Sequence, residues 1–295
     1  MLELRPNKPR FKIPTYLFDM KNFSTLSRAE CLTVYKEIIE NAQTKFSSAN
    51  KLAEAEDFGT AMSLQIIGME ELIKALFIFA DGKGFSFRQV EGMRGVFKNH
   101  GLRYLFSFFL FTFSVIGEGF GIGINYIRNI NDEKDFARIR AIKSNPNKLL
   151  REHIFPYLLD KLRFVIEELK WYKDFDKLRQ NGFYSDFDGD LINPNSIDET
   201  YYIEFKVRVD RVTKTVLSII DEFNLEIPFI EKYLPKIVDR AEEQGFYEIL
   251  ARFIAYTKEQ KMNALELMSL KLNEFVVSIE EEPPTFEDHQ PVQVK

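Results

Sequence analysis

The 295-residue chain is poor in the residues that usually build disulfides and metal centres, because it contains one cysteine, Cys31, and three histidines. A single cysteine excludes an internal disulfide and a zinc site made of thiolates. A metal centre based on histidine would need carboxylates to complete its ligand set. We therefore expect neither a metal nor another cofactor.

The chain also lacks an overall excess of positive charge, because it contains 40 Lys and Arg residues and 45 Asp and Glu residues, which give a formal net charge of −5. This balance argues against a protein that coats nucleic acid through bulk positive charge, although it is compatible with a local basic site. Residues 280–295 hold five acidic side chains against one lysine and have no apolar period. That composition predicts a disordered acidic tail.

The chain has no long hydrophobic run. Its first residues, MLELRPNKPRFK, are charged and do not resemble a secretory signal. The most apolar stretch covers residues 104–116, whereas a membrane-spanning helix needs about 20 apolar residues. The glycines at 117–123 interrupt this apolar run. We expect a buried core helix there, together with a cytoplasmic location and no membrane partner.

What the chain does have is helical periodicity, with apolar residues recurring every three or four positions. Three capping boxes, which begin at Ser27, Ser86 and Ser196, indicate helix starts. Residues 201–209 are rich in residue types that suit a strand, but the capping box before them and the continuing period favour a helix. We predict an all-α protein.

Breaks in the periodicity divide the chain. The predicted helices cover about 27–56, 60–80, 86 to beyond 103, 149–174, 196–223 and, with a break, 230–279. The predicted regions are an N-terminal extension (1–26), a helical domain (27–223) with an apolar insertion at about 104–127 and a turn-rich loop at 180–195, C-terminal helices packed on it (224–279), and the acidic tail (280–295).

The second predicted helix is apolar around most of its circumference, which is typical of a central, packed helix. A narrow polar sector contains Glu70, Glu71 and Lys74. Glu70 and Lys74 are four residues apart, in the order that favours an ion pair on one helix face. Two interpretations stay open: a solvent-facing strip with a surface ion pair, or a charged seam on a buried helix that faces a cleft or a partner.

Residues 83–103 form a local basic patch, in which five Lys and Arg against Glu91 give a charge of +4. This patch contains His100, and a histidine can accept or give a proton near pH 7. A neighbouring arginine can hold phosphate oxygens. These groups are sufficient to cleave RNA without a metal, because the 2′-OH of the RNA can attack its own phosphate. The alternative is a surface histidine on a basic, solvated helix.

The two candidate arginines differ in their spacing from His100. Arg103 lies three residues after His100 and shares one face of a continuous helix with it. Arg94 lies six residues before His100, about 120° away, and would converge on it only through a bend at Gly95 or from a second subunit. Lys98 and Arg88 are further candidates for RNA binding.

The turn-rich loop contains Tyr184 and Asp186, and an Asp side chain can cap a turn. A calcium loop starting at Asp186 fails the EF-hand pattern, because positions six and twelve are Leu191 and Ile197 instead of Gly and Glu.

Taken together, these segments resemble the HEPN domain of the AbiV-type abortive infection proteins of bacteria. The resemblance rests on MEELIKA at residues 69–75, on the basic stretch that ends in FKNHGLR at 97–103, and on NGFYSDFDGDLINP at 181–194. It covers about residues 30–220, with a break at 56–59 between the first two helices.

The resemblance implies a HEPN-like helical bundle that acts as a homodimer and as a metal-independent endoribonuclease. The family's Arg-x₄₋₆-His pattern is met by Arg94 and His100, with Arg103 as the rival arginine and with Glu71 and Lys74 orienting the site. Under the resemblance, Tyr184 and Asp186 either close the cleft of this site or only cap a turn. The implied function is a toxin-like anti-phage effector that blocks translation by cleaving an RNA substrate, with a phage-encoded protein as its trigger. The alternative is a non-catalytic helical interaction protein that binds a phage or host protein.

Overall fold

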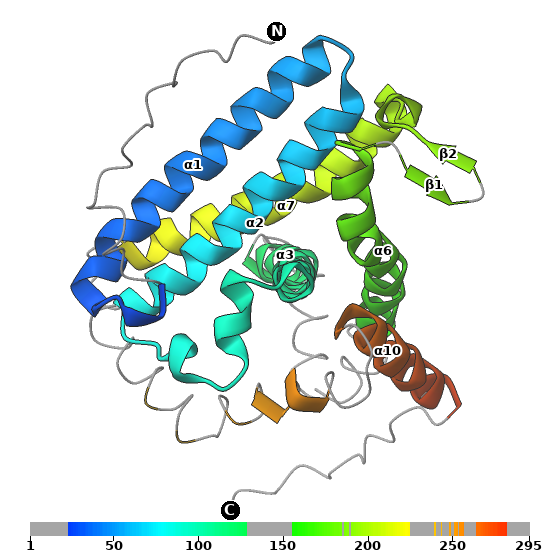
Figure 1. Cartoon of the computed structure of the whole chain (residues 1–295). Helices are drawn as coiled ribbons and strands as arrows, with labels where there is room; N and C mark the ends of the chain where they lie inside the picture. Colours follow the sequence, from blue (N-terminus) through cyan, green and yellow to red (C-terminus); the bar gives the residue numbers. More distant parts are fainter. Residues whose placement is uncertain are drawn as a thin grey trace, which may run out of the picture.

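The computed structural model describes residues 23–128, 155–224 and 264–281, apart from residues 185 and 189, and single residues between 239 and 256. This part of the chain is a bundle of α-helices with one small β-hairpin, which confirms the predicted all-α class. Helices α1 (Arg28–Glu54) and α2 (Phe58–Gly82) form an antiparallel pair, and α7 (Glu199–Asn224) lies behind them (Figure 1).

The first two helices begin at side chains that satisfy their free backbone amides. Ser27 and Glu30 form the predicted capping box at the start of α1, with the Ser27 amide donating to Glu30 Oε2 at 2.8 Å. Asp57 caps α2 by accepting a hydrogen bond from the Thr60 amide at 3.2 Å. The short break between the helices turns the chain back, so that α2 packs along the whole of α1.

Helix α2 is the central element, because it contacts α1, α3 (His100–Arg128), α6 (Phe155–Asn181) and α7. Most of its residues are buried, as its all-round apolar pattern predicted.

Aromatic side chains fill the space between α3, α6 and α7, and some of the chain's 29 phenylalanines are among them. The ring of Phe175 lies 4.6 Å from Tyr172, 5.2 Å from Phe205 and 5.6 Å from Tyr104, measured between centroids. Such large buried rings each stabilise the fold by roughly 1.5–3 kcal/mol through the apolar area they remove from water. This aromatic cluster fixes the first turns of α3 against α6.

The predicted helix start at Ser86 is wrong. Two short 3₁₀ turns, Phe87–Gln89 and Met93–Phe97, occupy this stretch, and α3 begins only at His100. Asp81, at the end of α2, accepts the backbone amide of Phe87 at 2.8 Å and thereby takes the place of a cap. Gly92, with φ of +83°, then turns the chain in a way that a regular helix does not allow.

Helix α3 runs without interruption to Arg128, through the glycines at 117–123 that end the apolar run of the sequence. Within the described part, His100–Gly117 is the helical segment that is long and apolar enough to cross a membrane, and part of it is buried in the protein. Core helices meet the same two criteria, so this segment carries no assignment to a membrane.

The turn-rich loop forms an antiparallel hairpin of β1 (Asp186–Asp188) and β2 (Asp190–Ile192), in which Phe187 pairs with Leu191. A 3₁₀ turn, Pro194–Ser196, follows, and α7 begins at Glu199. The predicted capping box at Ser196 is wrong, because Asp198 accepts the Tyr201 amide at 2.8 Å. Residues 201–209 are helical, as predicted.

The last described helix, α10 (Ala264–Glu281), packs against α6 and α3 (Figure 1). The predicted N-terminal extension up to residue 22, most of residues 225–263 and the tail from residue 282 lie outside the described residues.

Candidate functional site

The candidate site is centred on Glu70, a carboxylate that belongs to the middle of α2 and is only 3% exposed. His100, the first residue of α3, directs its Nδ1 atom at this carboxylate, 2.7 Å from Oε1 and 2.9 Å from Oε2. Carboxylate oxygens only accept hydrogen bonds, so Nδ1 carries a proton in this arrangement. The Glu70 side chain therefore fixes both the tautomer and the orientation of the imidazole.

Arg103 is the second partner of Glu70. Its Nη2 atom donates to Glu70 Oε2 at 2.9 Å, and its Nη1 atom donates to the Val96 carbonyl oxygen at 2.9 Å. The side chain is 3% exposed, and its Nε atom has no hydrogen-bond partner among the described residues. Nη2 also lies 2.7 Å from His100 Nδ1, so two donors converge on one carboxylate.

The burial of these groups makes the pair costly to break. Glu70 and Arg103 are both almost fully removed from water, and each supplies the opposite charge that the other needs. Removing one partner of such a pair leaves an uncompensated buried charge, which typically costs about 3–5 kcal/mol. His100 differs, because its side chain is 40% exposed and its Nε2 atom has no hydrogen-bond partner within the described part of the chain.

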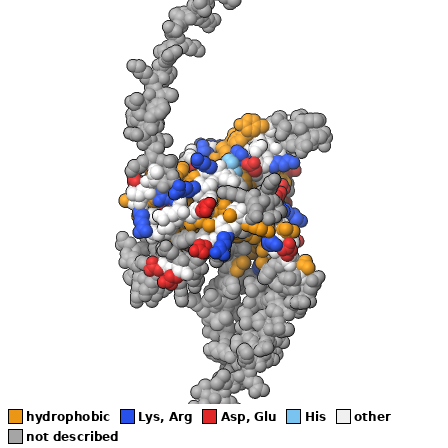
Figure 2. Space-filling model, turned by 60° about the horizontal axis from the view of Figure 1, so that its bottom comes forward, with side chains coloured by type: hydrophobic (Ala, Val, Ile, Leu, Met, Phe, Trp, Pro, Cys, Tyr) orange, Lys and Arg blue, Asp and Glu red, His pale blue; other side chains and the backbone are white. Residues whose placement is uncertain are grey.

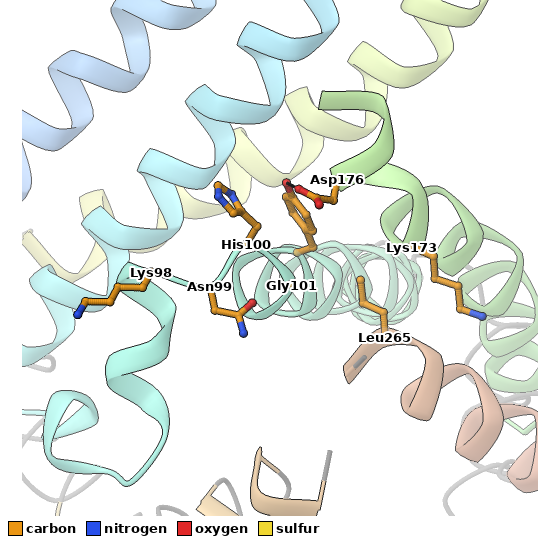
Figure 3. A pocket seen from close by; sticks show the side chains of 8 residues that line it. Lys98, Asn99, His100, Gly101, Lys173, Asp176 and Leu265 are labelled. Carbon is orange, nitrogen blue, oxygen red and sulfur yellow. Dashed lines mark hydrogen bonds between the residues drawn. The ribbon is translucent and has the colours of Figure 1, made fainter. Parts of the chain in front are cut away.

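An open pocket of about 490 Å³ lies beside His100. Figure 3 shows that its walls come from the start of α3, from α6 and from the first turn of α10. The pocket is lined by Lys98, Asn99, His100, Gly101, Tyr104, Lys173, Asp176 and Leu265. In the space-filling view a histidine side chain is visible at the surface, with Lys and Arg side chains nearby (Figure 2).

A polar cluster that contains Tyr104 of α3 and Asp176 of α6 lines another part of the pocket and links the two helices. Tyr104, one helical turn after His100, donates its hydroxyl to Asp176 Oδ1 at 3.5 Å. Asp176 also accepts from Arg179 Nη2 at 2.9 Å and from Gln180 Nε2 at 3.0 Å. Burial, and then the neighbouring Glu70 carboxylate, raise the pKa of Tyr104 well above its ordinary value, so its hydroxyl stays protonated.

Of the residues predicted for the site, His100, Arg103 and Glu70 come together. Glu71 does not reach His100, because it pairs with Lys74 at 2.6 Å on the same helix. The predicted ion pair between Glu70 and Lys74 is therefore absent, and Glu70 is not part of a solvent-facing strip.

Arg94 stays apart from the cluster. It lies in the second 3₁₀ turn, is exposed, and donates its Nε atom to the Arg88 carbonyl oxygen at 3.0 Å. Because α3 begins only at His100, Arg94 and His100 do not share a helix, and Arg103 is the arginine that contacts the histidine in this chain.

The two residues predicted to bind RNA differ in their placement. Lys98 is exposed and lines the pocket. Arg88 is turned inward, where it forms an ion pair with the buried Asp81 and donates to the carbonyl oxygens of Phe23 and Leu26. This structure therefore contradicts RNA binding by Arg88, since its guanidinium is already occupied in holding the chain before α1 against the end of α2.

Tyr184 and Asp186 belong to the hairpin region and not to the pocket lining. Tyr184 is 70% exposed, and its amide bonds to the Gln180 carbonyl oxygen at 3.0 Å. Asp186 is the first residue of β1, paired with Ile192. Of the two predictions made for these residues, the turn agrees with the structure and the closed cleft does not.

The pocket residues that sequence reasoning missed include Tyr104, Lys173 and Asp176. The position of Tyr104, four residues after His100, could have placed it on the same helix face. Lys173 and Asp176 follow His100 by more than 70 residues, and no motif surrounds them, so only the packing of α6 against α3 reveals them.

The arrangement suits proton transfer. Glu70 holds one nitrogen of His100 and leaves the other nitrogen at the edge of a pocket, which is how a histidine serves as an acid or a base. The pocket also adjoins the first turn of α3, where the helix dipole and the backbone amides other than that of Leu102, which Asn99 caps, favour an anion. Among the described residues, no group of three His, Cys, Asp or Glu side chains is arranged to hold a metal ion.

Fold and site together define an all-α domain with a partly exposed histidine that a buried carboxylate holds at the edge of a pocket. Comparison with protein families gives the particular class, since the family model of the HEPN domain described as AbiV matches residues 30–214. The chain belongs to this family and is an abortive infection protein of the HEPN type. No curated protein and no solved structure matches it.

Proposed function

We propose that this protein is an anti-phage effector that cleaves RNA without a metal and so blocks translation. The observation that carries the proposal is the contact between Glu70 and His100, which leaves His100 Nε2 open at the pocket. In RNA cleavage of this type, the 2′-OH attacks the adjacent phosphorus and the 5′-oxygen leaves. Such a reaction needs positioned acid–base groups, and each typically contributes about 10²–10⁴-fold to the rate.

The charges around the pocket support an anionic substrate. Lys98 and Lys173 line its two sides, whereas Arg103, behind the imidazole, is buried and paired with Glu70. The two lysines, with the α3 N-terminus, can balance the negative charge that develops on phosphorus in the transition state. A local site of this kind is compatible with the net charge of −5, of which the tail after residue 279 supplies −4.

The test is cleavage of total cellular RNA by the purified protein in EDTA. We expect fragments with 2′,3′-cyclic phosphate ends from the wild type and none from His100→Ala. Because His100 is partly exposed, the melting temperature of the variant should stay close to that of the wild type. Full cleavage by His100→Ala would refute this assignment, and Tyr184→Phe, at an exposed position outside the pocket, serves as the control.

We infer further that the effector acts in the cytoplasm as a homodimer and that a phage-encoded protein triggers it. These inferences are supported by the resemblance to AbiV-type HEPN proteins. Sedimentation of the purified protein would test the dimer, and co-expression with individual phage genes would test the trigger.

The second candidate function is a non-catalytic interaction protein. It is favoured by Phe113, which is 70% exposed on α3, next to the partly exposed Phe109. Under this alternative, wild-type protein leaves RNA intact in the assay above and Phe113→Ser abolishes phage protection, whereas His100→Ala does not.

A further inference from the structure

The pocket presents a second group suited to acid–base chemistry, in addition to His100. RNA cleavage through the 2′-OH requires that one group takes the proton from this hydroxyl and that another gives a proton to the leaving 5′-oxygen. The pocket contains one imidazole, two lysines and Tyr104. Tyr104 cannot serve as the base, because burial holds its pKa far above the ordinary value.

Asp176 is the carboxylate that lines this pocket. Its side chain is 49% exposed, whereas Glu70, the other carboxylate near His100, is buried behind the imidazole. Figure 3 shows Asp176 reaching from α6 to the side of α3 on which His100 lies. The carboxylate that can contact a substrate is therefore Asp176, and Glu70 acts only through His100.

The carboxylate of Asp176 is held in place without being fully occupied. Oδ1 accepts from Arg179 at 2.9 Å and, weakly, from Tyr104 at 3.5 Å, while Oδ2 accepts from Gln180 at 3.0 Å. Each carboxylate oxygen has two lone pairs, so Oδ2 keeps one for a substrate hydroxyl. The backbone at this end of α6 is anchored as well, because Ser63 on α2 donates to the Arg179 carbonyl oxygen at 2.8 Å.

We propose that Asp176 is the general base of the reaction and His100 the general acid. Asp176 takes the proton of the 2′-OH as the bond between the 2′-oxygen and phosphorus forms. The bond from phosphorus to the 5′-oxygen breaks, its electron pair stays on that oxygen, and His100 Nε2 donates a proton to it. The products are a 2′,3′-cyclic phosphate and a 5′-hydroxyl, and protonated Asp176 and neutral His100 exchange protons with solvent.

Glu70 completes this assignment of roles. The buried carboxylate accepts a hydrogen bond from Nδ1 and so fixes the orientation in which Nε2, the nitrogen that gives up the proton, lies at the pocket. This inference rests on the proposed ribonuclease function, and it assigns each proton transfer to a named atom of one chain.

The experiment measures single-turnover cleavage of a short RNA in EDTA by the wild type and by Asp176→Asn. We expect Asp176→Asn to lower the rate by about 100-fold or more and to remove the fall in rate at low pH, because no base is then left to be protonated. Asp176→Glu should recover part of the rate. Asp174→Asn is the matched control, since Asp174 is an exposed residue on the same helix outside the pocket.

A second substrate separates the base from the acid and from a merely structural role. In RNA with a 5′-bridging sulfur, the thiolate leaves without needing a proton. We expect this substrate to restore cleavage by His100→Ala and not by Asp176→Asn. Restored cleavage by Asp176→Asn, or a wild-type rate and pH profile for this variant on ordinary RNA, would overturn the base assignment alone. Absence of cleavage by the wild type would overturn the proposed function and this inference together.

Discussion

Glu70 and His100 are thirty residues apart in the sequence, yet Glu70 Oε1 lies 2.7 Å from His100 Nδ1. One is buried in the middle of α2 and the other begins α3 at the edge of a pocket. This contact holds a partly exposed imidazole in a fixed orientation against the central helix.

The first prediction concerns the charge of Glu70. Glu70→Gln removes the counter-charge of the buried Arg103, so the free energy of unfolding should fall by about 3–5 kcal/mol. Urea unfolding followed by circular dichroism measures this loss. Glu37→Gln, the same change at an exposed position on α1, should alter stability by less than about 0.5 kcal/mol. Equal stabilities of the two variants would show that the buried pair does not form.

Arg103 should be coupled energetically to Glu70. Arg103→Met keeps much of the side-chain volume but leaves Glu70 buried without its arginine, so this variant should also be strongly destabilised. The double variant with Glu70→Gln should be less destabilised than the sum of the two single changes, by about 0.5–3 kcal/mol.

The control for Arg103 is Arg94→Met, at an exposed position in a 3₁₀ turn, which should leave the free energy of unfolding nearly unchanged. Strict additivity of Glu70→Gln and Arg103→Met would contradict a direct contact between the two side chains.

The third prediction concerns Gly182, where α6 ends against the start of α2. A Cβ atom at this position would collide with the Gly59 carbonyl oxygen and with Ser63 Oγ. Gly182→Ala should therefore lower stability by about 1–3 kcal/mol, because α6 must move away from α2. Gly117→Ala is the control, since a Cβ there meets no atom within 4 Å. An unchanged melting temperature for Gly182→Ala would contradict this close packing.

Tyr104 should make stability depend on pH in the alkaline range. Its pKa is raised in the folded state, mainly by burial, so its contribution to stability is fully present below the ordinary value of 10.0 and is lost as the pH rises above it. Tyr104→Phe cannot ionise, so between pH 10 and 11 its stability should fall less steeply than that of the wild type. Parallel stability curves for the two proteins over this range would contradict the buried position of the hydroxyl.

The sequence by itself determined the helical class and the first two helices with their break, and it singled out His100 as the candidate histidine of the site. These features are local: periodicity and the capping side chains of Ser27 and Asp57 act over a few residues. The prediction of a helix start at Ser86 failed because a side chain from the preceding helix, Asp81, accepts backbone amides there. Asp81 accepts the Phe87 and Arg88 amides just after Ser86, the Gln89 amide bonds to the Ser86 carbonyl oxygen in a 3₁₀ turn, and α3 begins only at His100.

Only the tertiary structure decided which charged side chains form ion pairs. Glu70, Glu71 and Lys74 share one polar sector, and spacing alone pairs Glu70 with Lys74. Packing of α3 against α2 instead buries Glu70 beneath His100 and Arg103, and Lys74 turns to Glu71. Asp176 enters the pocket for the same reason: a side chain far away in the sequence is brought there by the aromatic cluster between α3, α6 and α7, and no local pattern encodes that contact.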